Sequence, residues 1–66
     1  MANVKFIAEE NQSQNGVSVK WYEITGLVGY HDDGVYGLYS NGSVVDAENY
    51  PLSDNADIII NAIEHS

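Results

Sequence analysis

Hydrophobic and polar residues alternate over much of the chain between residues 3 and 47. A period of two is typical of half-buried β-strands, because successive side chains point to opposite faces of a sheet. The alternating runs are also rich in valine and aromatic residues, which favour strands. We predict five strands, over residues 3–9, 17–25, 27–31, 35–40 and 43–47.

Pairs of asparagine or aspartate with glycine separate these runs. Such pairs adopt at low cost the positive φ angles that a tight type I′ turn requires. The three pairs are Asn15-Gly16, Asp33-Gly34 and Asn41-Gly42. The last pair predicts a two-residue hairpin, and the first, which follows a polar stretch, predicts a longer hairpin loop. The middle pair predicts a third hairpin, so the strands should form an antiparallel meander.

Both faces of the predicted strand 17–25 carry large apolar side chains. Val19 and Trp21 belong to one face, whereas Tyr22 and Ile24 belong to the other. Either a helix covers one face and a partner chain the other, or the strand runs through a strongly coiled sheet. In the first strand, alternation places three apolar side chains on one face: Val4, Phe6 and Ala8.

The period of the pattern changes after Pro51, which interrupts the last strand. Four apolar residues then recur at the i, i+3, i+4 and i+7 spacing of one helix face: Ala56, Ile59, Ile60 and Ile63. We predict a helix over residues 54–64 with Ser53 or Asp54 as its N-cap. The chain is therefore predicted to be a single α+β domain, an antiparallel β-meander of four to five strands with one C-terminal α-helix packed on the sheet.

Charge restricts the partners that such a domain can meet. The 66 residues include ten carboxylates, two lysines and no arginine, which gives a formal charge of −8. Since 44% of the residues are hydrophobic, the chain should fold rather than form a disordered acidic tail. Binding to nucleic acid or to an anionic membrane requires lysine and arginine, so both are disfavoured. The negative field favours a basic surface on another protein.

Composition also points to a compartment. The chain has no cysteine, which excludes disulfides and thiolate metal sites. Its first residues lack the basic region and the apolar run of a signal peptide, and no stretch approaches eighteen apolar residues. We therefore expect a cytoplasmic protein.

Residues that could carry out chemistry are few. His31 and His65 are the two imidazoles, and no nucleophile motif accompanies them. The densest group of possible metal ligands is His31-Asp32-Asp33, but adjacent aspartates before a glycine are typical of a turn. We therefore predict no catalytic site, no cofactor and no metal.

The aromatic residues suggest a contact surface. Trp21, Phe6 and five tyrosines are more than a core of this size should hold, and exposed tyrosine is enriched at protein interfaces. Together with nearby carboxylates, the exposed tyrosines should form an acidic and aromatic surface. The predicted partner-binding residues are Glu9, Glu10, Tyr22, Asp32, Asp33, Tyr36, Tyr39, Asp46 and Glu48.

In size and charge the chain resembles the small acidic inhibitors that phages and other mobile elements make against restriction and CRISPR enzymes, some of which are DNA mimics. This resemblance implies a non-enzymatic inhibitor that occupies a basic, nucleic-acid-binding surface of a larger protein without binding nucleic acid itself. Steric blocking of that surface is as compatible with the sequence as true mimicry. The alternative hypothesis is a small homodimeric structural or regulatory module, in which the partner subunit covers the second apolar face of the strand 17–25.

Overall fold

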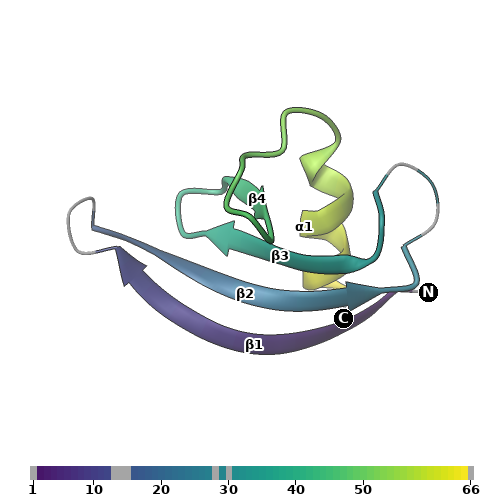
Figure 1. Cartoon of the computed structure of the whole chain (residues 1–66), viewed down its shortest axis with the longest axis horizontal. Coiled ribbons are helices and arrows are strands. Elements are labelled where there is room, and N and C mark those ends of the chain that lie inside the picture. Colours follow the sequence, from purple (N-terminus) through teal and green to yellow (C-terminus); the bar gives the residue numbers. More distant parts are fainter. Residues whose placement is uncertain (1, 13–15, 28, 30, 66) are drawn as a thin grey trace.

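The computed structural model describes residues 2–12, 16–27, 29 and 31–65 of the chain. It contains a four-stranded antiparallel sheet in the order β1-β2-β3-β4 and one C-terminal helix, so the predicted α+β fold is confirmed (Figure 1). The elements are β1 (Asn3–Gln12), β2 (Val17–Thr25), β3 (Gly34–Tyr39), β4 (Val44–Asp46) and α1 (Ala56–Glu64).

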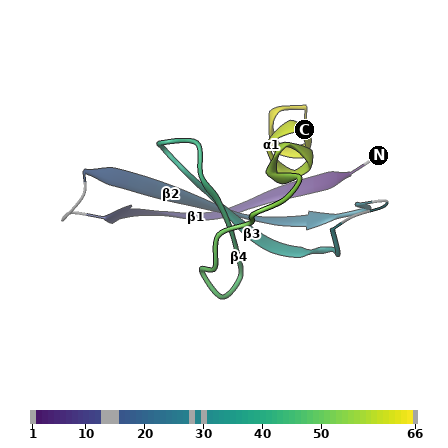
Figure 2. The same cartoon turned by 90° about the horizontal axis from the view of Figure 1, so that it is seen from above.

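The helix covers only part of the sheet. The sheet is strongly curved, and α1 lies on one of its two sides, toward the end where β1 begins, while the β1–β2 hairpin extends away from it (Figures 1 and 2). At about 3.3 Å per residue, the nine residues of β2 span roughly 30 Å. At about 1.5 Å per residue, the nine residues of α1 span roughly 14 Å. Part of the helix side of the sheet therefore stays uncovered.

The main core lies between α1 and the sheet. Ile24 of β2 and Ile59 of α1 are fully buried, and Tyr36 of β3 and Val44 of β4 complete the cluster. The predicted helix stripe is confirmed, since the other three stripe residues pack against this cluster: Ala56, Ile60 and Ile63. The predicted N-cap is wrong. Asn55 occupies that position in a left-handed conformation, and its side chain makes no capping hydrogen bond.

A second, smaller core occupies the opposite face. Val19 of β2 is fully buried there, and Val45 of β4 is also buried. Trp21 lies directly over Gly37 of β3, where a Cβ atom would come within 2.9 Å of Trp21 Cζ3. The Trp21 indole Nε1 also donates a hydrogen bond to Glu10 Oε1 at 2.7 Å. The curved sheet thus covers its own second face with a tryptophan and a glycine, and no partner chain is needed to bury Val19.

A β-bulge at Ile7 changes which face the β1 side chains occupy. Phe6 pairs with Tyr22, but Ala8 pairs with Trp21, the next residue along β2. Because Tyr22 and Trp21 point to opposite faces, the prediction that Phe6 and Ala8 share a face is wrong. β1 also continues to Gln12, beyond the predicted end at residue 9.

The strand predicted over residues 27–31 is not formed. The described residues of this segment, Leu27, Gly29 and His31, lie in the loop between β2 and β3, and Val28 and Tyr30 fall outside the described residues. Gly26 has a φ of 78°, which turns the chain out of β2. The Leu27 N–H then donates to Asp33 Oδ1 at 2.9 Å, so Asp33 closes this loop rather than a tight hairpin.

The hairpin between β3 and β4 is also one residue longer than predicted. The Gly42 N–H donates to the Tyr39 carbonyl and the Tyr39 N–H to the Ser43 carbonyl, which encloses a three-residue loop. Gly42 has a φ of 96°, whereas Asn41 does not have the positive φ that a type I′ turn requires. The corresponding prediction for the first hairpin rests on Asn15, which lies outside the described residues.

Candidate binding groove and the acidic residues

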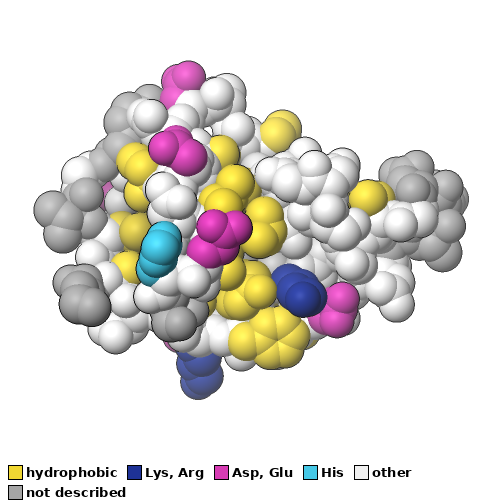
Figure 3. Space-filling model, turned by 180° about the vertical axis from the view of Figure 1, so that it is seen from behind, with side chains coloured by type: hydrophobic (Ala, Val, Ile, Leu, Met, Phe, Trp, Pro, Cys, Tyr) yellow, Lys and Arg dark blue, Asp and Glu magenta, His cyan; other side chains and the backbone are white. Residues whose placement is uncertain are grey.

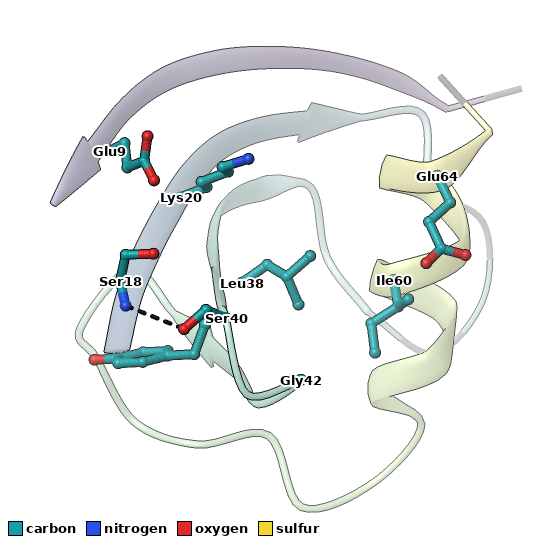
Figure 4. Close-up of a pocket in the computed structure, with 9 residues that line it drawn as sticks. Glu9, Ser18, Lys20, Leu38, Ser40, Gly42, Ile60 and Glu64 are labelled. Carbon is teal, nitrogen blue, oxygen red and sulfur yellow. Dashed lines mark hydrogen bonds between the residues drawn. The ribbon is translucent and has the colours of Figure 1, made fainter. Parts of the chain in front are cut away.

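A groove of about 400 Å³ lies on the helix side of the sheet, where α1 leaves it uncovered. Its walls come from β1, β2, β3, the β3–β4 loop and α1, with β1 and β2 on one side and α1 on the other (Figure 4). The lining residues are Glu9, Ser18, Lys20, Leu38, Tyr39, Ser40, Gly42, Ile60 and Glu64.

The floor of the groove is apolar. Leu38 of β3 and Ile60 of α1 point toward one another across it (Figure 4) and both pack against the main core. Strand alternation puts Leu38 on the same face as Tyr36, under the helix. Figure 3 shows hydrophobic side chains gathered in the middle of this side of the molecule, with charged side chains at their margin.

Charged side chains form the rim. Glu9 of β1 pairs in register with Lys20 of β2, and both are exposed. Glu64 is also exposed and lies on the helix side of the groove, one turn after Ile60, so these two residues share a helix face. Two carboxylates therefore flank the apolar floor from opposite sides, and the Lys20 side chain extends from β2 between them (Figure 4).

The structure does not bring the predicted partner-binding residues into one surface. Glu9 lines the groove, whereas Glu10 points to the opposite face and binds Trp21. Asp32 and Asp33 are exposed in the β2–β3 loop, near the Thr25 end of β2, whereas Glu9 pairs with Lys20 toward the other end. The predicted acidic residues thus lie on both faces of the sheet and toward both of its ends instead of forming one continuous patch.

The prediction that Tyr36 belongs to the partner-binding surface is wrong. Tyr36 is only 7% exposed, so it belongs to the core and not to a contact surface. Its hydroxyl donates to the Asp32 carbonyl at 2.6 Å. Burial raises the pKa of Tyr36, and the charges of Asp32, Asp46 and Asp33 raise it further. These three aspartates therefore lie around one buried phenol.

The remaining predicted residues serve the local structure as well as the surface. Tyr22 is half-buried, and its ring packs edge-on against Phe6 at 5.7 Å. Tyr39 is half-buried and its hydroxyl donates to Asn49 Oδ1. Asp46 Oδ1 accepts hydrogen bonds from the N–H groups of Glu48 and Tyr50, which shape the loop after β4. In that loop Glu48 itself is exposed.

Sequence reasoning missed most of the groove and the exposed apolar residues. Phe6 is 54% exposed and Ile7 is 50% exposed, because the bulge and the short helix leave this part of β1 uncovered. Tyr50 is exposed as well. One signal was available in the sequence: the i, i+4 spacing of Ile60 and Glu64 places a carboxylate directly beside the apolar stripe.

Comparisons with known proteins add no functional assignment. No family model, no curated protein and no solved structure matches this chain. Among the described residues, no group of three or more His, Asp or Glu side chains is placed to hold a metal ion. Within the same part of the chain, no helix has the length and apolar character of a membrane span.

Proposed function

We propose that this protein is a non-enzymatic inhibitor that binds a basic surface of a larger protein, such as a nucleic-acid-binding groove. The observation that carries the proposal is the placement of the carboxylates. All are exposed except Asp46, which is half-buried. The carboxylates therefore face solvent and give the domain a negative surface potential. Such a potential can steer association with a cationic partner.

The likeness in size and charge to phage inhibitors of restriction and CRISPR enzymes supports the same proposal. A surface that binds nucleic acid is lined with lysine and arginine, and it attracts carboxylates for the reason that it attracts phosphates. Because the carboxylates lie on both faces of the sheet and one side holds an apolar groove, we favour steric occupation of such a surface over close mimicry of a DNA strand.

The test is the salt dependence of association with a partner isolated from host extract. Association should slow steeply as salt rises from roughly 50 to 500 mM, while dissociation changes less, because screening weakens long-range attraction first. The double variant Asp32→Asn/Asp33→Asn should slow association without unfolding the domain. An association rate that does not change with salt would contradict the proposal.

A homodimer is the second candidate. The sequence suggested it because a partner subunit could cover the second apolar face of β2, but Val19 on that face is already buried within the chain. However, β1 is an edge strand of ten residues that carries two large exposed apolar side chains, Phe6 and Ile7. Such an edge can pair with a second copy. Sedimentation velocity over a range of concentrations distinguishes a stable dimer from a monomer.

A further inference from the structure

We infer that the groove between α1 and the β1–β2 arm is the docking site for an extended, arginine- or lysine-bearing segment of the partner protein. This inference rests on the proposed function and makes it specific, because it assigns the contact to one side of the domain. It also predicts the chemistry of the segment that binds there.

The chemistry of the groove matches a long basic side chain. Lysine and arginine have aliphatic stems that lie on apolar surface while their charged ends reach a polar rim. Leu38 and Ile60 supply the apolar floor, and Glu9 and Glu64 supply a carboxylate on each side (Figure 4). An arginine whose stem covers the floor can therefore bind either carboxylate with its guanidinium group.

The backbone around the groove argues for binding through side chains. β2 is paired with β1 on one edge and with β3 on the other, so it cannot accept an added strand. At the end of the groove, the Ser18 N–H donates to Ser40 Oγ and the Ser40 N–H to the Ser18 carbonyl. Since these groups already have partners, a ligand must be held by charge and apolar contact.

The size of the groove limits the occupant. A volume of about 400 Å³ is near the lower end of the range of roughly 300–1,000 Å³ that is usual for small-ligand pockets. Such a space accepts a few side chains of an extended segment but not a folded helix. Lys20 is a cation that lines the groove, and its ammonium group repels an incoming basic side chain.

The first experiment measures binding of a fluorescent pentapeptide of alternating arginine and leucine, at low salt, to the folded protein. The double variant Glu9→Gln/Glu64→Gln should weaken binding by roughly fivefold to twentyfold, which lies within the range of about twofold to thirtyfold for two exposed ion pairs. The matched control is Glu23→Gln/Glu48→Gln, which removes the same charge from exposed residues outside the groove. The control variant should weaken binding by about twofold or less, because it removes only long-range attraction, which salt screens.

The second experiment uses a change of the opposite sign. Lys20→Gln should tighten binding of the pentapeptide, because it removes a positive charge from the lining of the groove. Lys5→Gln makes the same change in net charge, but Lys5 pairs with Glu23 on the other face and does not line the groove. It should therefore tighten binding much less. Methyl shifts of Leu38 and Ile60 in the NMR spectrum should report contact with the leucines.

The outcomes distinguish a failure of the proposed docking site from a failure of the proposed function. Equal effects of the groove and control variants would overturn the groove as the docking site, and so would an absence of pentapeptide binding. Either result leaves the proposed function in place if association with the isolated partner still depends on salt. A salt-independent association would instead overturn the proposed function, whatever the pentapeptide does.

Discussion

The two faces of the sheet bury their apolar residues in different ways. On one face, Ile24 is covered by a separate element, the helix α1, through Ile59. On the other, Val19 is covered by residues of the sheet itself, because Trp21 and Val19 both lie close over Gly37. On opposite sides of β2, a helix and a tryptophan–glycine pair thus each cover a buried apolar residue.

The difference explains where a binding site can form. On the tryptophan face, the Trp21 ring lies so close to Gly37 that a Cβ atom there would overlap it. The helix face is covered by an element about half as long as β2, so an apolar floor stays open beside charged residues. The less completely covered face is therefore the one available to a partner.

The largest effect should come from the helix face. Ile59→Ala removes a fully buried side chain from the main core and should lower the free energy of unfolding by about 2–5 kcal/mol. Ile58→Ala is the matched control, since Ile58 is half-buried and lies off the stripe. Urea denaturation measures both. Equal losses would show that the helix does not anchor this face through Ile59.

On the tryptophan face, Gly37→Ala should cost about 1–3 kcal/mol, because the added Cβ overlaps the Trp21 ring and the ring must shift. The fluorescence spectrum of Trp21 should change at the same time. Gly34→Ala in the same strand is the control, because a Cβ at Gly34 has nothing within 4 Å. An unchanged stability and spectrum for Gly37→Ala would mean that the ring does not seal this face.

The next effect depends on pH and tests the helix face again. The pKa of Tyr36 is raised in the folded state, so the folded protein holds this proton more tightly than the unfolded chain. The resulting stability is fully present below the ordinary tyrosine pKa of about 10 and is lost as pH rises through the folded pKa. Tyr36→Phe should therefore lose less stability between pH 9 and 12 than the unchanged protein, as measured by urea denaturation at each pH. Parallel pH profiles would refute the assignment.

The smallest effect should follow from Glu10→Gln. The carboxylate of Glu10 accepts the Trp21 indole hydrogen bond at an exposed position, so weakening it should cost less than about 1 kcal/mol. The indole N–H resonance should move in the NMR spectrum. Glu9→Gln, the neighbouring change on the opposite face, should leave that resonance in place. A similar shift in both variants would contradict the hydrogen bond between Glu10 and the Trp21 indole.

Patterns local in sequence predicted the elements of the fold well. The alternation over residues 17–25 and the stripe of Ala56, Ile59, Ile60 and Ile63 depend on backbone periodicity, which a short window of sequence already contains. For this reason β2 and the last residue of α1 lie where they were expected. The same local patterns misplaced the strand at 27–31: the described residues of this segment, Leu27, Gly29 and His31, lie in a loop, because β2 pairs directly with β3.

What the sequence determined by itself was the class of the fold, its strong negative charge and the face of the helix that packs. Only the tertiary structure decided which carboxylates and aromatics share a surface. The bulge at Ile7 moved the later side chains of β1 to the opposite faces of the sheet. The curvature of the sheet buried Val19 beside Trp21, and the short length of α1 left the groove open. Each of these depends on how distant segments fit together in register and in length, and no local pattern of residues contains that information.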